Sequence, residues 1–181
     1  MTIDHQQWTP LSVEALGEVR DDAFHITAAA NMASIAAEGF RTDRRGVLGT
    51  GAYFDLGSEV TGWVPARERY PDQPLIVFRC EVALGQVLDL DDEETRARFI
   101  KFQRGYVQEV GREEGARLGQ GGHIDEFLNE LAESGEIYDT IRRTFTTDGL
   151  TRIAVRDAGR IRVLSVHDEK GVELPWPPIS H

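Results

Sequence analysis

Residues 24–54 constrain the fold of this chain more than any other segment. The segment begins with a histidine on a short apolar run, continues through a stretch of small residues, and reaches a glycine-rich loop before an aromatic pair. Its pattern predicts a strand over 24–27, a helix over 28–38, a loop over 41–51 and a strand over 52–55. The two predicted strands present His25 and Tyr53.

The predicted helix has a clear physical basis. Met32, Ile35 and Ala36 recur at i, i+3 and i+4, which places them on one apolar stripe. Thr27 precedes the helix as a potential N-cap, because a hydroxyl can accept a hydrogen bond from a free helical N–H. Gly39 falls where a left-handed C-cap is expected.

The most strongly patterned strand covers residues 75–84. One face is apolar throughout and two more apolar side chains lie on the other, which is typical of a strand buried inside a sheet. The first face comprises Ile76, Phe78, Cys80, Val82 and Leu84, and the second carries Leu75 and Val77.

The remaining elements follow an irregular order. Upstream, Ser12 is expected to cap a short helix through Val19, and a helix from Ser58 is expected to be interrupted at Pro65. Downstream we predict a strand over 86–90, a long helix opened by Asp91 and Asp92, a glycine-rich loop over 119–122, a helix over 124–131, and a closing pair of strands over 151–156 and 161–166 joined across 158–159. Strands and helices do not alternate regularly along the chain, and this irregular order indicates an α+β fold with a mostly antiparallel sheet.

Length and composition limit the class of protein. A chain of 181 residues fits one domain, 1–181, with 1–20 as a lead-in and 172–181 as a Pro-rich peripheral tail. The net charge of −11 argues against binding of bulk nucleic acid, because phosphate contacts need a high density of Lys and Arg. A local basic cleft for a nucleic-acid substrate stays open. Cys80 is the single cysteine, and neither a signal peptide nor a membrane-spanning run is visible, so we expect a cytoplasmic protein without a membrane partner.

Common catalytic motifs are missing from the sequence. It has no P-loop, no paired CxxC, no HExxH and no Gly-x-Ser-x-Gly, and its five histidines are scattered, so we expect no metal. His25 and Tyr53, linked by the glycine-rich loop, form the one constellation with functional character. Taken singly, each is more simply explained as a packed strand residue. His123 follows a glycine-rich stretch, and we expect a mobile surface position there.

Several short motifs in order resemble the ADP-ribosyltransferase superfamily, specifically its diphtheria-toxin-like branch, which includes the poly(ADP-ribose) polymerases. The matching positions are His25-Ile26-Thr27, Ile35, Glu38-Gly39-Phe40 and Gly49-Thr50-Gly51-Ala52-Tyr53-Phe54. The His-Ile-Thr variant resembles the opening of the DNA-modifying members. Residues 75–90 and 153–166 are similar to later strands of the family. The resemblance therefore covers most of the chain, and it implies a split, mostly antiparallel sheet with flanking helices.

The resemblance also implies NAD as the substrate and a set of residues that bind it. That set is His25, Ile26, Thr27, Gly49, Gly51 and Tyr53. By resemblance, the His25 side chain would bind a ribose hydroxyl, the main chain of Ile26 would pair with the nicotinamide amide, and the Tyr53 ring would stack on nicotinamide. The two glycines would let the main chain pass close to NAD.

One position departs from the family pattern. The family usually places a glutamate at the start of the penultimate strand, and matching residues 151–157 to that strand puts Arg152 or Thr151 there. We therefore treat Arg152 as a candidate catalytic position. Asp148, Asp157 and Glu136 are the alternative carboxylates nearby in sequence.

The first expectation for function is transfer of ADP-ribose from NAD to a macromolecular acceptor, protein or nucleic acid, with NAD hydrolysis as a side or main reaction. An RNA 2′-phosphotransferase is a second NAD-using candidate, which the acidic balance disfavours because it would need a basic cluster for phosphate. The third alternative is a catalytically inactive member that serves as a binding or immunity module.

Overall fold

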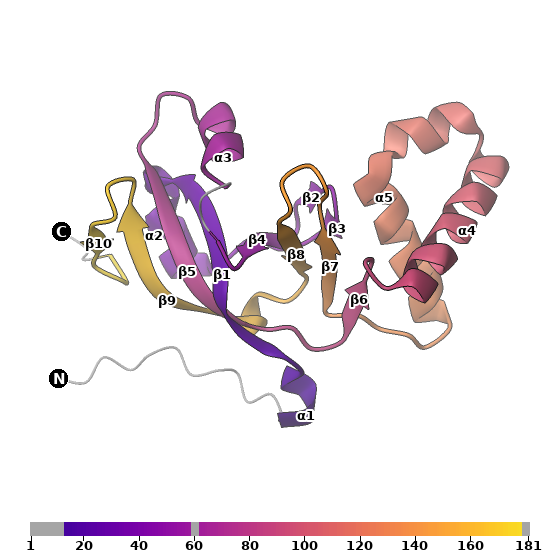
Figure 1. Cartoon of the computed structure of the whole chain (residues 1–181), viewed down its shortest axis with the longest axis horizontal. Helices are drawn as coiled ribbons and strands as arrows, with labels where there is room; N and C mark the ends of the chain where they lie inside the picture. The colour runs from indigo at the N-terminus through magenta and orange to yellow at the C-terminus, as the bar shows by residue number, and fades with distance from the viewer. Residues whose placement is uncertain (1–12, 59–61, 179–181) are drawn as a thin grey trace.

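The computed structural model describes residues 13–58 and 62–178 and shows a mixed α+β fold (Figure 1). Its helices are α1 (Val13–Leu16), α2 (Met32–Glu38), α3 (Trp63–Arg69), α4 (Glu93–Val110) and α5 (Arg112–Glu133), with short 3-10 turns η1 (Ala29–Asn31) and η2 (Ala158–Arg160). Its strands are β1 (Val19–Ala28), β2 (Arg45–Gly46), β3 (Gly49–Thr50), β4 (Ala52–Leu56), β5 (Leu75–Ala83), β6 (Val87–Asp89), β7 (Thr140–Thr144), β8 (Thr151–Val155), β9 (Ile161–Asp168) and β10 (Glu173–Leu174).

Within the described residues, eight strands form one sheet in the order β10-β9-β5-β1-β4-β8-β7-β6, and β2 pairs with β3 in a separate hairpin. All neighbouring strands of the large sheet are antiparallel except β6 and β7. The α+β class with a mostly antiparallel sheet is therefore confirmed.

The sheet consists of two four-stranded halves joined by a short contact. Strand β1 pairs with β5 along most of its length but with β4 only at Ala23↔Leu56 and Phe24↔Asp55. Beyond Phe24 the two strands diverge, as Figure 1 shows between β1 and β4. We call this divergence the split. It confirms the prediction of a split sheet.

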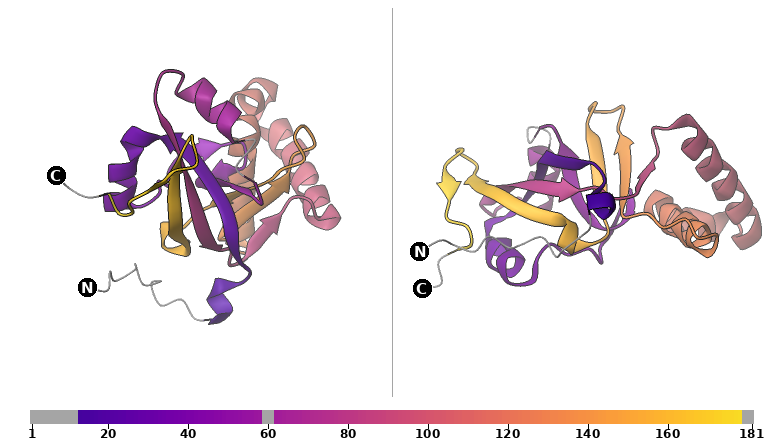
Figure 2. Two further views of the ribbon diagram at one scale, coloured as in Figure 1. Left: turned by 60° about the vertical axis from the view of Figure 1, so that its left-hand side comes forward. Right: turned by 90° about the horizontal axis from the view of Figure 1, so that it is seen from below.

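Each face of the sheet carries its own apolar core. On one face, α2 packs through Met32 and Ile35 against a core that includes Phe40, Phe54 and Phe78. On the other, α5 packs against β7 and β8 in a core that includes Leu48, Ile124, Phe127, Leu128 and Ile141. Alternation along β4 explains the division, because Phe54 belongs to the first core and Tyr53 packs against the second. Figure 2 shows the α4–α5 pair lying away from α2.

Three helix predictions near the N-terminus need correction. Thr27 does not cap α2: it is the second-last residue of β1, and α2 begins after the η1 turn without a side-chain cap. The first helix ends at Leu16, not Val19, while its proposed cap Ser12 lies outside the described residues. Pro65 does not interrupt a helix, since it is the third residue of α3, where its missing N–H would have no helical partner.

Two further predictions are wrong in the C-terminal half. The loop over 119–122 is a single break at Gly119 (φ 67°, ψ 174°) within α5. Residues 151–156 and 161–166 do form strands, but they are not paired with each other. Strand β8 lies between β4 and β7, whereas β9 lies between β5 and β10. The η2 turn carries the chain from one half of the sheet to the other.

Candidate functional site at the split

The direction of the main-chain N–H and C=O groups along β1 determines which of them are open to a ligand at the split. The N–H of Ala29 donates to Pro74 O at 2.8 Å on the β5 side, and Asp22 O accepts from Gly57 N at 2.9 Å on the β4 side. Because successive residues of a strand turn their N–H and C=O to alternate sides, the even-numbered residues of this stretch face β4. Phe24 uses this orientation to pair with Asp55.

Ile26 is the next residue that faces β4, and there β4 has already diverged. Within residues 13–58 and 62–178, its N–H and C=O have no strand partner on that side. Ile26 is also only partly buried. A strand residue with both groups free offers one donor and one acceptor, side by side, to an incoming molecule.

His25 is held beside the split by its own side chain. Its Nδ1 lies 2.8 Å from Tyr53 O, and because a carbonyl can only accept, Nδ1 carries the proton and donates. The imidazole packs against Phe40, Phe54 and Phe78 with ring centroids 5.2, 5.7 and 6.4 Å away. This burial lowers the pKa of His25, so the ring is neutral at neutral pH.

The second ring nitrogen of His25 is therefore a hydrogen-bond acceptor. Nε2 has no hydrogen-bond partner in the described part of the chain, and it is not among the buried unpartnered side-chain atoms found there. A hydroxyl group is the natural partner for such a nitrogen.

Tyr53 reaches this region through its main chain and not through its ring. Its carbonyl binds His25, but its phenol points to the opposite side of β4, where its Oη accepts from Leu48 N at 2.9 Å and donates to Gly49 O. No ring contact joins His25 and Tyr53 in the described residues. Burial raises the pKa of Tyr53 to about 12, so the phenol remains a neutral donor that fastens the β2–β3 hairpin.

The glycine-rich loop forms this hairpin and is clamped onto α5. Asp125 accepts from Thr50 N at 2.7 Å, from Thr50 Oγ1 at 2.9 Å and from Arg45 Nε at 2.7 Å. Gly49 has φ 86°, and a Cβ there would lie 2.6 Å from Asp125 Oδ1. A Cβ at Gly51 would lie 3.0 Å from Val155 O. Both glycines thus have packing reasons to be glycine, whatever they bind.

Arg152 lies on the Tyr53 side of the sheet, where two carboxylates pair with its positive charge. Its Nε donates to Asp55 Oδ1 at 2.9 Å, and its Nη2 pairs with Asp148. Its guanidinium also lies over the Phe145 ring, 4.9 Å from the centroid. Two carboxylates therefore surround one cation. Arg143, directly opposite Arg152 on β7, adds a second positive charge over the same Phe145 ring, 5.4 Å from its centroid, so these four charges balance.

The three carboxylates considered from the sequence all have other tasks in the structure. Asp148 accepts from Leu150 N in the β7–β8 turn and pairs with Arg152. Asp157 accepts from Gly159 N and caps the η2 turn. Glu136 pairs with Arg98 of α4 and accepts from the Tyr138 hydroxyl.

Asp55 is the carboxylate that the sequence reasoning missed. It is the cross-strand neighbour of Phe24, at the point where the split begins, and its side chain is only 14% exposed. Burial raises its pKa and the Arg152 charge opposes that rise. Period-two alternation from Tyr53 could have placed Asp55 on the same face of β4, but not at the split.

Two other residues lie near His25: Thr27, which the resemblance implied, and Arg69, which the sequence did not point to. Thr27 is buried, and its hydroxyl accepts from Asn31 Nδ2 at 2.8 Å, so it is already used within the fold. Arg69, at the end of α3, is exposed and lies near enough to His25 for its charge to contribute to lowering that pKa. No ion pair of Arg69 is formed among the described residues.

In residues 13–58 and 62–178 no three His, Cys, Asp or Glu side chains are grouped so that they could hold a metal ion. Likewise, none of the helices there combines the length and the apolar character that crossing a membrane requires.

The chain has structural similarity to solved proteins but no match at the level of sequence. No protein-family model and no curated protein matches the sequence. Among solved structures, a chain of the M. tuberculosis MbcT–MbcA toxin–antitoxin complex superposes with a TM-score of 0.41. The two chains share 14% identity over 86% of this chain and 88% of that one.

Proposed function

We propose that this chain binds NAD at the split, releases nicotinamide and transfers ADP-ribose to a macromolecular acceptor, with water as a competing acceptor. The observation that carries the proposal is the open N–H and C=O of Ile26 next to the acceptor nitrogen of His25. The resemblance of residues 25–54 to ADP-ribosyltransferases supports the same assignment.

A nicotinamide carboxamide complements the open main chain of Ile26. Its NH₂ group donates and its C=O accepts, so it can form with Ile26 the two hydrogen bonds that a neighbouring strand would form. A ribose hydroxyl then supplies the donor that His25 Nε2 lacks. Arg69 is the cation we assign to the pyrophosphate, since it lies near His25 and has no carboxylate partner in the described residues.

The reaction breaks one bond and forms another. When the bond between ribose C1′ and the nicotinamide nitrogen breaks, its electron pair leaves with nicotinamide, which becomes neutral, and positive charge develops on the ribose. A hydroxyl or amine of the acceptor attacks C1′ and loses a proton. Water in the same role yields free ADP-ribose. A fixed negative charge near the ribose lowers the barrier, because it stabilises charge that exists only in the transition state.

We assign that negative charge to Asp55. Residue 55 pairs with Phe24 at the start of the split, its carboxylate lies on the Tyr53 face of β4 beside Arg152, and the Arg152 charge helps to keep it ionised by opposing the effect of burial. Arg152 is then a positioning residue, and it does not itself face the developing cation as a net positive charge.

Incubation of the purified chain with NAD labelled in the adenosine part, with and without a cell lysate, tests the activity. Label on protein or nucleic acid supports the transferase, and free ADP-ribose alone supports a hydrolase. Retained NAD binding without turnover would leave the inactive binding module as the correct alternative. Absence of NAD binding would contradict the proposal as a whole.

Replacing Ile26 by proline should weaken binding of nicotinamide at least about tenfold, since it deletes one hydrogen bond worth roughly 1.5 kcal/mol. The change removes an N–H that faces the split and none that pairs with β5. Calorimetry measures the affinity, and Ile26→Val, which keeps the N–H, is the matched control. Equal affinity of the two variants would remove Ile26 from the site.

Tyr53 allows the ring and the hydroxyl to be separated. Tyr53→Phe should lower the melting temperature, because Leu48 N and Gly49 O lose their partner, while NAD affinity stays within about threefold. Because the ring lies on the side of β4 away from His25, Tyr53→Leu should bind NAD as Tyr53→Phe does. A further loss of about 1 to 3 kcal/mol, the scale of a lost aromatic contact, would support the stacking that the resemblance implies. If both variants bind NAD alike, Tyr53 serves the hairpin and does not stack on nicotinamide.

A further inference from the structure

We propose a second ligand site, in the groove between α4 and α5, for a small molecule that combines one anionic group with an apolar body. The groove has a volume of about 430 Å³, within the range of small-molecule sites. It lies at the β6 end of the sheet, and its lining includes none of the residues assigned above to the split.

A bend in α5 creates the groove. Gly119 leaves helical geometry with φ 67° and ψ 174°, a conformation that favours glycine. His123 Nε2 lies 2.9 Å from Gly115 O across this bend. In a straight helix eight residues rise about 12 Å, so this hydrogen bond requires the bend. Gly115 in turn packs closely against Val107 of α4, where a Cβ would lie 2.8 Å from its Cγ2.

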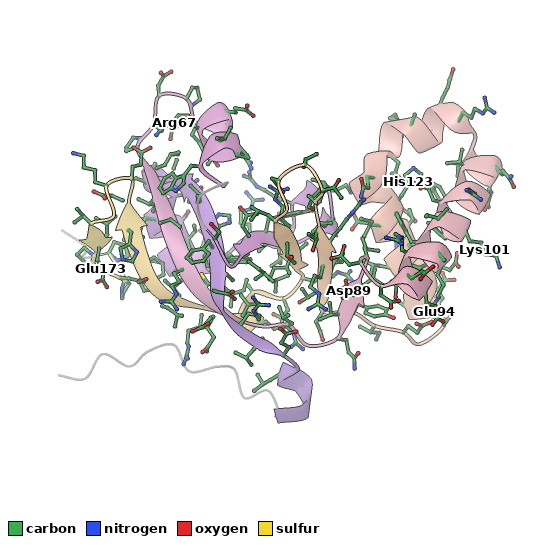
Figure 3. The ribbon with its side chains drawn as sticks, in the orientation of Figure 1. Arg67, Asp89, Glu94, Lys101, His123 and Glu173 are labelled. Atoms are coloured by element: carbon green, nitrogen blue, oxygen red, sulfur yellow. The ribbon has the colours of Figure 1, made fainter. Side chains whose placement is uncertain are left out.

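His123 lines the groove and has one buried nitrogen without a partner in the described residues. The expectation of a mobile surface position was wrong, because the residue is 5% exposed and its ring packs edge-on against Tyr106 at 5.7 Å. Nε2 donates to the Gly115 carbonyl, whereas Nδ1 is buried with no hydrogen-bond partner in the described residues. Figure 3 shows His123 directed from α5 into the space facing α4. A buried polar atom without a partner is costly, and a ligand that pairs with it removes that cost.

The charges around the groove select an anion. Arg96 and Arg143 both line it, and in residues 13–58 and 62–178 neither forms an ion pair. Arg98 and Arg117, on the same two helices, are both paired with glutamates. In a chain with net charge −11, these two arginines beside one buried imidazole make a local positive site. Because Nε2 carries the proton that is donated to Gly115 O, Nδ1 is an acceptor for a ligand O–H, such as that of a monoprotonated phosphate ester.

The floor of the groove selects an apolar body. Leu90, Phe99 and Ile100 line it together with the polar groups, and Ile100 is 40% exposed. A carboxylate or phosphate ester on an aromatic or aliphatic body would therefore satisfy both parts. Inorganic phosphate would use only the arginines and His123.

Titration of the ¹⁵N-labelled chain with phenyl phosphate, benzoate, phenol and inorganic phosphate tests the site by NMR. At least one of the two aromatic anions should move the signals of Gly115, Gly119 and the His123 ring. It should bind at least tenfold more tightly than phenol or inorganic phosphate. The double variant Arg96→Gln/Arg143→Gln should lose at least tenfold in affinity for that anion. Arg112→Gln, which removes an exposed arginine at the start of α5, should leave it unchanged.

Three results would overturn the proposal: no shift at these signals with either anion, equal binding of phenol, or an equal loss in the Arg112→Gln control. Shifts centred on Ile26 would assign the anion to the split and would also count against the groove. His123→Gln, whose amide can still donate to Gly115 O, should keep the fold and weaken binding of the aromatic anion. Melting curves of all variants confirm that the fold is retained.

Discussion

Asp55→Asn should slow nicotinamide release by roughly 10²- to 10³-fold, the usual effect of removing one group that stabilises transition-state charge. NAD affinity should change much less, because the ribose is not yet cationic in the bound substrate. The expectation rests on the position of Asp55 beside Phe24 at the start of the split, with its side chain 14% exposed. Single-turnover release of labelled nicotinamide, measured beside NAD affinity, checks both halves of the prediction.

Arg152→Gln is the matched control, because it breaks the same ion pair and keeps the carboxylate. Loss of Arg152 removes the charge that lowers the pKa of Asp55, so this pKa rises further. The variant should then be active at pH 8 and lose activity at a higher pH than the wild type as the pH falls. If Arg152→Gln is as inactive as Asp55→Asn at every pH, the pair is structural and Asp55 is not the charge that serves the reaction.

Gly121→Ala should destabilise the chain by about 2 to 4 kcal/mol, a large value for overpacking by one methyl group. A Cβ at Gly121 would lie 1.8 Å from Gly46 O, which is main chain and cannot rotate away. Either α5 or the β2–β3 hairpin must move. A thermal melt should show a decrease of roughly 5 to 15 °C for a chain of this size. The Asp125 clamp and the Tyr53 phenol hold the same hairpin, so NAD binding should fall with it.

Gly105→Ala should change the melting temperature in the opposite direction. Gly105 lies inside α4, and no atom stands within 4 Å of a Cβ there, so alanine gains helix propensity at no steric cost. This variant should raise the melting temperature by a few degrees. No change for Gly121→Ala would contradict the packing described between α5 and the hairpin. A decrease for Gly105→Ala would contradict the open surroundings described for Gly105.

Local signals were sufficient for most elements. The alternation in 75–84 predicted β5, and all but two of the residues from Leu75 to Leu84 are buried. Asp92 caps α4 by accepting from Thr95 N at 2.8 Å, close to the predicted opening of that helix. Both successes follow from interactions between residues near in sequence, namely the strand period and the helix cap.

Contacts between distant residues were decided only by the tertiary structure. The residue pattern around 151–166 predicts two strands but does not say that β4, β5, β7 and β10 lie beside them. The environment of His123 depends on a bend that brings a carbonyl eight residues away into reach. Sequence periodicity also does not show which polar side chains pair with each other. Arg152, for example, pairs with Asp55, which is 97 residues away along the chain.

Residue patterns alone predicted the α+β class, most of the strands and helices, and the candidate pair His25 and Tyr53. The tertiary structure decided how that pair is used, because the Tyr53 carbonyl and its phenol leave β4 on different sides. It also decided where the sheet divides. The physical reason is that β1 loses β4 after Phe24, so the main chain of Ile26 is left with hydrogen-bonding groups that a neighbouring strand would otherwise have satisfied.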